Sequence, residues 1–340
     1  MKISRKTHVI EGVKPDAVPY DELLAADRPT ILKGLVRDWP LARTTSAEQA
    51  ARYLESFYQG RPVVVFVAQP ELKGRFGYTS DATKLDFAAG RGSLKEYLAK
   101  ILAHLEDENA PSFYIGSTDV DTYLPGFRAE NDLVLNHLMF ESNPPLVAAW
   151  IGNRTTALAH YDMSHNIACC LVGRRRFSLF PPEQIANLYP GPLEPTPGGQ
   201  VVTMTDINNP DFTRFPGLRE ALAAGEIADL EPGDALFYPA LWWHQVEALS
   251  SFNVMVNYWW TTSPQYMDTP QNTLLHAILS LRDRPEPEKR AWRALFDYYI
   301  FGPAGRAAAH LPEAARGLLG PLDDIRARRL RAQLLQRFNR

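Results

Sequence analysis

The chain has 340 residues, of which 45% are hydrophobic and 22% are charged, and its formal net charge at pH 7 is −3. This composition indicates a globular protein with a sizeable hydrophobic core, and the small net charge argues against a general nucleic-acid-binding protein. No run of about 18 apolar residues occurs, so no membrane-spanning helix is expected.

Two further features bear on the compartment. The first residues are basic, but no apolar stretch of signal-peptide length follows them. The two cysteines, Cys169 and Cys170, are adjacent and cannot cross-link distant parts of the chain. A reducing, cytoplasmic location is therefore expected.

The N-terminal part of the chain predicts mixed helices and strands. Residues 29–40 predict a short buried strand that ends in a turn, and residues 61–69 predict a strand rich in β-branched residues. Residues 46–60 and 93–107 carry apolar residues at helical spacing and predict amphipathic helices. Residues 111–117 are another candidate strand.

The pattern changes in the second half of the chain. From about residue 145 to residue 262, short apolar runs alternate with Gly, Pro, Asp and Asn turns, which predicts a β-sandwich or barrel of jelly-roll type. Residues 265–340 return to helical patterns. We therefore expect a domain over residues 1–264 with a β core at about 111–262, followed by a helical extension over residues 265–340.

His160 and Asp162 lie two residues apart at the mouth of an apolar strand. Because side chains alternate between the two faces of a strand, both should point into one cavity. His244, which follows a Pro-Gly-Asp turn and two tryptophans, is the best candidate for a third ligand. Two histidines and one carboxylate form the facial triad of non-haem Fe(II) oxygenases, which leaves positions open for a 2-oxo acid and O2. These three residues are the predicted metal ligands and catalytic residues.

Two alternatives stay open at this point. His165 is a rival ligand, although its odd offset from His160 turns it to the other face of a regular strand. The other alternative is a hydrogen-bonded core network of His160 and Asp162 without a metal. The remaining histidines lie in helical or flanking segments and are expected to be surface or packing residues: His8, His104, His137, His276 and His310.

Several motifs follow one another in order through this region. They are His160-Tyr161-Asp162, then FSLFPP (177–182), NPDFTRFP (209–216), PGDALFYPALWWH (232–244) and VNYWW (256–260). Together they resemble the JmjC/cupin-like 2-oxoglutarate oxygenases, and most closely the branch that contains the factor-inhibiting-HIF asparaginyl hydroxylase. The resemblance is strong over residues 150–262 and looser over 110–150. It implies a mainly β fold with a double-stranded β-helix (cupin, jelly-roll) core and flanking N-terminal and C-terminal helices.

By position, the resemblance places Fe(II) on the same three residues that the spacing singles out. It further implies that Tyr114 contacts the distal carboxylate of the cosubstrate 2-oxoglutarate, and that Asn166 and Asn257 lie near the carboxylate that chelates the iron. Asn166 shares the face of His160 and Asp162 if one strand carries all three. Asn257 lies between apolar neighbours, where an amide without a partner is costly.

Two positions depart from the family pattern. The family commonly has a lysine for the distal carboxylate where this chain reads Arg174-Arg175-Arg176, with Arg175 at the matching position. A guanidinium can bind a carboxylate through two parallel hydrogen bonds, so the role can survive the change. Ala157 stands where relatives often carry a Thr or Ser hydroxyl, and the adjacent Thr156 is expected to face the other way.

The resemblance implies a dioxygenase that converts 2-oxoglutarate and O2 to succinate and CO2 while it hydroxylates a peptide side chain or a small molecule. Two alternatives are a metal cupin without 2-oxoglutarate chemistry and a catalytically silent binding or regulatory protein. The asparaginyl hydroxylases carry an Arg-Gln pair about where this chain has Val201-Val202, so their substrate is not carried over.

The C-terminal helical segments carry more apolar residues than a short tail can bury on itself, notably over residues 291–301 and 325–338. An exposed patch of this kind usually marks an interface, and a two-fold dimer is the commonest outcome. The resemblance also implies dimerisation through C-terminal helices. We therefore expect a homodimer, with packing of these helices against the β core of their own chain as the alternative.

Overall fold

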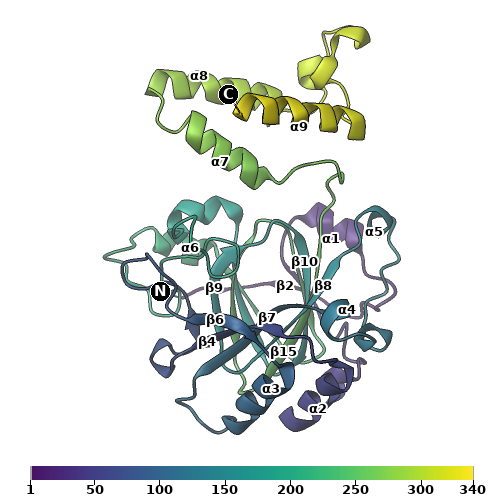
Figure 1. Cartoon of the computed structure of the whole chain (residues 1–340), viewed down its shortest axis with the longest axis vertical. Coiled ribbons are helices and arrows are strands. Elements are labelled where there is room, and N and C mark those ends of the chain that lie inside the picture. Colours follow the sequence, from purple (N-terminus) through teal and green to yellow (C-terminus); the bar gives the residue numbers. More distant parts are fainter. Residues whose placement is uncertain (1, 340) are drawn as a thin grey trace. The chain divides into compact units, whose positions relative to one another are not determined.

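The computed structural model describes residues 2–339 and separates the chain into two compact units. The first unit ends at Thr261 and consists of β-sheets flanked by helices, and the second begins at Thr262 and is helical (Figure 1). Within the described residues, no helix is both long enough and apolar enough to cross a membrane.

Two sheets form the first unit. The larger sheet has the strand order β2-β3-β13-β10-β15-β8-β7-β4-β6, and the smaller has the order β1-β12-β11-β14-β9-β5. The strands of the larger sheet are β2 (His8–Ile10), β3 (Thr30–Leu32), β4 (Val63–Ala68), β6 (Ala88–Gly92), β7 (Ser112–Asp119), β8 (Leu146–Gly152), β10 (His165–Val172), β13 (Ala235–Tyr238) and β15 (Asn253–Trp260). Those of the smaller sheet are β1 (Arg5–Lys6), β5 (Arg75–Phe76), β9 (Thr156–Tyr161), β11 (Arg175–Phe180), β12 (Glu226–Leu230) and β14 (Trp243–Ala248). The predicted mainly β, jelly-roll fold is confirmed.

The helices of the first unit lie outside the sheets. They are α1 (Tyr20–Ala26), α2 (Ala47–Phe57), α3 (Leu94–Ala103), α4 (Val120–Tyr123), α5 (Met139–Ser142) and α6 (Leu218–Ala224). Helix α2 begins after Ser46, whose hydroxyl accepts a hydrogen bond from the Gln49 N–H and so caps the helix. The predicted amphipathic helices within 46–60 and 93–107 are confirmed as α2 and α3, and the strand predictions at 29–40, 61–69 and 111–117 are confirmed as β3, β4 and β7.

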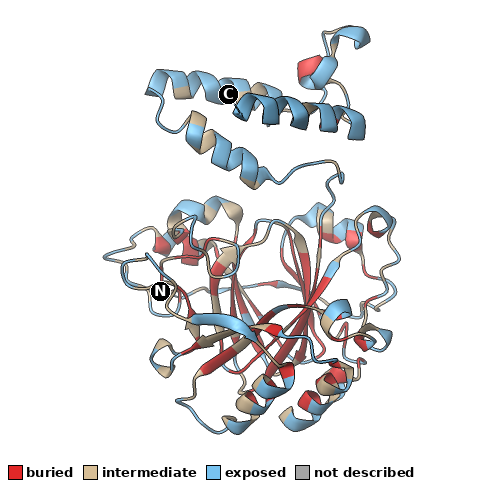
Figure 2. Ribbon diagram, in the orientation of Figure 1, coloured by how far each residue is buried: buried red, intermediate tan, exposed pale blue. Residues whose placement is uncertain are grey.

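Strand β10 shows how the core is built. Ile167 and Cys169 pack in the hydrophobic cluster that includes α2 and α3, whereas Ala168 and Cys170 pack in the cluster that includes β11 and β12 of the smaller sheet. Because both faces of β10 are covered, its sequence is continuously apolar rather than alternating. Figure 2 shows the central strands as the buried part of the unit. The two cysteines are buried free thiols.

The turn between β10 and β11 sets the position of Arg175. Gly173 in this turn has φ of +72°, and a Cβ there would lie 2.4 Å from Oδ1 of Asn253 and 2.6 Å from the carbonyl oxygen of Phe252. Only glycine combines this backbone conformation with so close an approach. Arg175 therefore begins β11 directly after a turn whose geometry is restricted.

The second unit contains three longer helices, α7 (Pro270–Ser280), α8 (Glu286–Tyr299) and α9 (Asp324–Phe338). Among its described residues, only Ala307, Ala308 and Ala327 are buried hydrophobic residues. Its exposed large apolar residues include Leu274, Leu275, Leu279, Trp292, Leu295, Tyr299, Ile300, Phe301, Ile325, Leu334, Leu335 and Phe338. The unit thus buries no large apolar side chain, although each of its helices carries several.

Candidate active site

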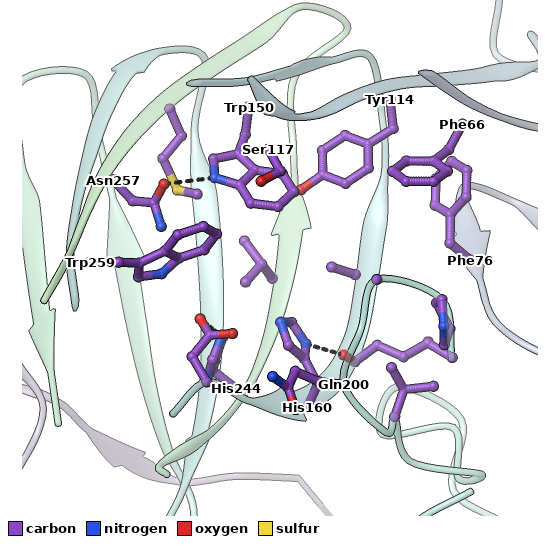
Figure 3. A pocket seen from close by; sticks show the side chains of 18 of the residues that line it. Phe66, Phe76, Tyr114, Ser117, Trp150, His160, Gln200, His244, Asn257 and Trp259 are labelled. Carbon is purple, nitrogen blue, oxygen red and sulfur yellow. Dashed lines mark hydrogen bonds and ion pairs between the residues drawn. The ribbon is translucent and has the colours of Figure 1, made fainter. Parts of the chain in front are cut away.

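A cavity of about 380 Å³ lies in the first unit. Its walls include residues of β5, β9 and β14 of the smaller sheet and of β4, β7, β8, β13 and β15 of the larger sheet. Figure 3 shows His160 and His244 on one side of this cavity and Tyr114 and Trp150 across from them. The predicted ligands therefore face a space large enough for a small carboxylic acid and part of a substrate.

His160, Asp162 and His244 converge at this cavity. One potential ligand atom from each lies within 4.8 Å of the others, and Nε2 of His244 is 3.6 Å from Oδ2 of Asp162. Over residues 2–339, no other group of three His, Cys, Asp or Glu side chains meets in this way. Two imidazoles and one carboxylate are a donor set that suits Fe(II), so the residues present fit the metal that the spacing predicts.

A β-bulge in β9 orients His160. His160 pairs with His244 and Ala157 pairs with Val246, so β9 has one more residue than β14 between the two pairs. The carbonyl oxygen of Leu158, within the bulge, lies 2.7 Å from Nδ1 of His160. Because a carbonyl oxygen can only accept, Nδ1 carries the proton and Nε2 is left with its lone pair free for a metal.

His244 is held in the same way from the opposite strand. Its Nδ1 donates to the carbonyl oxygen of Trp242 at 2.9 Å, so Nε2 is again the free nitrogen. Burial, and then the neighbouring His160, lower the pKa of His244 to about 4. The side chain is therefore neutral at pH 7, which is the form that coordinates metal ions.

Asp162 follows the end of β9, and its backbone is tied to the turn that leads into β14. The carbonyl oxygen of Asp162 accepts a hydrogen bond from the Leu241 N–H at 2.8 Å. Leu241 has φ of +67°, an unusual conformation for a leucine and a sign of a constrained turn. This bond links the segment of one ligand, Asp162, to the segment of another, His244.

The rival ligand His165 lies outside this cluster. Its Nδ1 accepts the N–H of Ala240 at 3.3 Å, and its ring stacks on Phe237 with a centroid separation of 6.4 Å. Burial lowers the pKa of His165, so its unprotonated form is favoured in this packing position. His165 therefore packs in the core and does not join the three converging residues.

Asn166 lies on a different strand from the one that the sequence predicted. The prediction that one regular strand carries His160, Asp162 and Asn166 is wrong, because β9 and β10 are separate strands with Asp162 between them. Asn166 pairs instead with Tyr238 and Trp259, both of which line the cavity. Its side chain is fully buried, and neither amide atom has a hydrogen-bond partner among the described residues. An amide left in this state costs about 1–3 kcal/mol, so a ligand or water partner is expected there.

Asn257 lines the cavity from β15 and already has a partner. Its Oδ1 accepts a hydrogen bond of 2.7 Å from Nε1 of Trp150, drawn as a dashed line in Figure 3. The Trp150 ring also stacks on Tyr114, with centroids 5.6 Å apart. The two predicted cosubstrate residues Tyr114 and Asn257 are therefore joined through Trp150.

Arg175 is a buried cation that forms no ion pair with any described residue. Its side chain is 2% exposed, its Nη2 donates only a long 3.4 Å bond to the Trp150 carbonyl oxygen, and its Nε has no partner among the described residues. Burial lowers the pKa of Arg175, and burial raises the pKa of the nearby Tyr114 phenol to about 12. A buried charge is costly unless it is paired, so this arrangement suits a carboxylate that enters beside Tyr114.

The two arginines adjacent to Arg175 differ from it in exposure. Arg174 and Arg176 are exposed, and Arg176 forms an ion pair of 2.7 Å with Asp229. Ala157 lines the cavity together with His160 because the bulge shifts the alternation of β9. Neither Asn166 nor Arg175 forms part of the cavity wall itself, and both are buried next to residues that do.

Several wall residues were not among the candidate site residues. They include aromatic side chains and part of the segment between β11 and α6: Phe66, Phe76, Phe87, Trp150, Trp259, Pro197, Gly198 and Gln200. Phe87 packs edge to face against Phe66 and Phe76, with centroids 5.5 and 5.2 Å apart. Aromatic residues in strands usually belong to the core, so nothing in their spacing distinguishes them from packing residues.

Comparisons with known proteins agree with this geometry. The family described as "Cupin-like domain" matches residues 15–266. The chain is 25% identical to "HSPB1-associated protein 1" of Homo sapiens over 302 residues, which covers 83% of this chain and 58% of that protein. It is 24% identical to "Lysine-specific demethylase 8" of Xenopus tropicalis over 247 residues, covering 71% of this chain and 50% of that protein.

A shorter match has higher identity. The chain is 32% identical to "Lysine-specific demethylase JMJ31" of Arabidopsis thaliana over 115 residues, which covers 32% of this chain and 20% of that protein. The chain thus spans between 20% and 58% of the length of these three relatives. The resemblance to the asparaginyl hydroxylase branch in particular stays a prediction.

Proposed function

The chain belongs to the cupin-like domain family, and from this premise we propose that it is an Fe(II)- and 2-oxoglutarate-dependent dioxygenase. In this proposal it hydroxylates a protein or peptide side chain or a small molecule with O2 and releases succinate and CO2. Relatives named as JmjC proteins and lysine demethylases support an oxygenase of the 2-oxoglutarate type.

The observation that carries the proposal is the convergence of His160, Asp162 and His244 within 4.8 Å. These residues would hold Fe(II), which when bound supplies the O2-activating chemistry. The two Nδ1–H bonds to the carbonyl oxygens of Leu158 and Trp242 keep both imidazoles in the tautomer that can coordinate.

The cosubstrate would lie between this centre and the buried guanidinium. Arg175 and Tyr114 would bind the distal carboxylate of 2-oxoglutarate through a charge-assisted pair and a phenol hydrogen bond. Asn166 and Asn257 would lie near the other end of the molecule. The surrounding aromatic side chains exclude water, which strengthens these polar contacts.

Two observations bear on the two alternatives. A metal cupin that does not use 2-oxoglutarate has no need of a buried, unpaired Arg175, and a silent scaffold has no need of three ligands in register. Both features together favour the dioxygenase.

The proposal predicts turnover of 2-oxoglutarate in the absence of any added substrate. The purified chain with Fe(II), O2 and 2-oxoglutarate should release succinate slowly, because activated oxygen is consumed even when no substrate is hydroxylated. Succinate is measured by mass spectrometry, and omission of Fe(II) or of O2 should stop its formation. A chain that binds Fe(II) and 2-oxoglutarate but never forms succinate would contradict the dioxygenase proposal, and one that binds Fe(II) alone would favour the other cupin chemistry.

We also propose a homodimer in a reducing, cytoplasmic compartment. The buried free thiols of Cys169 and Cys170 support the compartment. The helices of the second unit support the dimer, because they expose large apolar side chains such as Trp292, Leu295 and Leu335 and bury none. A second copy of the same helices is the proposed cover, since two-fold dimers are the commonest symmetric assembly.

Truncation after Pro264 should therefore change the assembly state. The full chain is expected to sediment as a dimer at micromolar concentration, and the truncated chain is expected to be monomeric or insoluble. Analytical ultracentrifugation of both proteins measures this directly. A full-length chain that sediments as a monomer at that concentration would rule out the dimer.

A further inference from the structure

Strand β6 is an unpaired edge of the larger sheet. It pairs with β4 on one side, and no strand within residues 2–339 pairs with its other side. Its residues Ala88, Ala89, Gly90 and Arg91 are all exposed, as Figure 2 shows for this part of the sheet. At the opposite edge of the same sheet, β2 is shorter, and the outer strands β1 and β5 of the smaller sheet have two residues each. β6 is thus the longest edge strand among the described residues.

Apart from one charged residue, Arg91, this edge lacks the features that usually protect an edge strand. Proteins commonly cover edges or interrupt them with proline, lysine or a bulge, because an open edge presents free N–H and C=O groups to other chains. β6 has the sequence AAGRG and pairs with β4 residue by residue without a register shift. An open, regular edge of this kind is a template for another extended segment.

Gly90, in the middle of β6, is not explained by the fold of this chain. Glycine weakens a strand and in strand interiors often marks the close approach of a ligand or another backbone. A Cβ placed on Gly90 would have no heavy atom within 4 Å, and its φ is not in the left-handed region. Neither the backbone conformation nor packing within the chain therefore requires a glycine here.

The edge is continuous with the wall of the candidate active site. Phe87, the residue before β6, lines the cavity, and Ala89 pairs with Phe66 of β4, which also lines it. Paired residues share one face of a sheet, so the Ala89 and Phe66 side chains point to the same side. Every second side chain of a segment added to β6 would face that side.

We propose that β6 binds an extended polypeptide segment by strand addition, and that this segment carries the residue presented to the cavity. The inference rests on the proposed function and narrows it, because it selects a polypeptide over a small molecule as the substrate class. The backbone groups of β6 would supply most of the affinity. Arg91 is exposed and forms no ion pair with another described residue. It pairs with Val64, on the Phe66 side of β4, so an acidic residue in the segment is preferred there.

The test uses the full chain and a defined set of peptides. Each peptide alternates threonine and valine, carries either one aspartate or one lysine, and presents each natural amino acid in turn at its centre. Hydrogen exchange of residues 88–92 is measured with and without the peptides, and succinate formation from 2-oxoglutarate is measured in parallel. Exchange in β6 is expected to slow by about tenfold or more with the aspartate peptides. Some of these peptides are also expected to raise succinate formation several-fold.

Two proline variants separate edge pairing from damage to the sheet. In an antiparallel ladder, successive N–H groups point alternately toward the partner strand and away from it. Of Ala89→Pro and Gly90→Pro, one therefore breaks the ladder with β4, and the other keeps the parent's melting temperature and blocks only the outer edge. The variant that keeps the melting temperature should lose peptide protection and stimulation while unstimulated turnover persists. Gly305→Pro is the matched control, since Gly305 has open space around it and a φ of −81° that proline tolerates.

A charge reversal adds a readout that loss of stability cannot mimic. Arg91→Glu should change the preference from aspartate to lysine peptides. Peptides that leave β6 exchange unchanged, or stimulation that persists in the edge-blocking variant, would overturn the inference. Protection of β6 that depends on protein concentration without peptide would assign the edge to a second copy and overturn it too. Peptide protection of β6 without any succinate would leave the docking site standing and remove the proposed dioxygenase function.

Discussion

Replacement of His244 or His160 by alanine should abolish Fe(II) binding. The anaerobically purified parent is expected to bind about one Fe(II) per chain, because two imidazoles and a carboxylate converge on one point. Each substitution leaves only two protein ligands. Loss of even an outer-sphere partner lowers metal affinity by about 10- to 100-fold, so loss of a ligand should exceed that range. Anaerobic titration with metal analysis of the desalted protein measures the effect.

His165→Ala is the matched control for this experiment. His165 is the same residue type in the same region, but its ring packs on Phe237 and lies outside the cluster. Its variant should bind Fe(II) like the parent, whatever it does to the melting temperature. If a His160→Ala/His244→Ala double variant binds iron like the parent, the assignment of the three ligands is wrong.

Removal of the Arg175 guanidinium should weaken 2-oxoglutarate binding by orders of magnitude. Truncation of one partner of a buried, hydrogen-bonded charge pair costs about 2–5 kcal/mol, which corresponds to roughly a 30- to several-thousand-fold increase in Kd. Calorimetric titration of anaerobic, Fe(II)-loaded Arg175→Ala and Arg175→Met measures the change. Tyr114→Phe should have a smaller effect, because it removes one neutral hydrogen bond of about 0.5–1.5 kcal/mol.

Stability distinguishes this role from a structural one. Without ligand, Arg175 is a buried charge with no partner at Nε, so Arg175→Met should melt no lower than the parent. The increase in melting temperature that 2-oxoglutarate causes in the parent should disappear in this variant.

Arg176→Ala is the control for Arg175, because Arg176 is exposed and pairs only with Asp229 at the surface. Its 2-oxoglutarate affinity should match that of the parent. Unchanged affinity in both Arg175 variants would move the contact to Arg174, Arg176 or another arginine. A parent chain that binds no 2-oxoglutarate would instead favour a cupin with other chemistry.

The three metal ligands were predicted from two kinds of information. The pairing of His160 with Asp162 is a local pattern, since two residues of the same parity at a strand end face the same way in almost any sheet. The choice of His244 over His165 rested on the Pro-Gly-Asp turn and the two tryptophans that precede His244, and on the odd offset of His165 from His160. The structure explains that choice through the direct pairing of His160 with His244 across β9 and β14.

Features that depend on short-range periodicity could be predicted from the sequence. The helical spacing in 46–60 and 93–107 predicts α2 and α3, and alternating or continuous apolar runs predict most strands of the core. The alternation of short apolar runs with turn residues predicted a jelly-roll type of fold, and the family resemblance of the ordered motifs implied the double-stranded β-helix. Short-range periodicity does not show that Arg175 is buried between two exposed arginines, because all three are the same residue type in the same local context.

Features that depend on pairing between distant strands could not be predicted in this way, because they arise only when the sheets assemble. The bulge that places Ala157 and His160 on one face exists only because β9 pairs with β14, and it breaks the parity that a regular strand would impose. Asn166 lies next to cavity-lining residues from β10 rather than from the strand of His160, because β9 ends at Tyr161 and a new strand begins at His165. The open edge of β6 is likewise a property of the assembled sheet, because a strand's position at an edge is set by which partners the rest of the chain supplies.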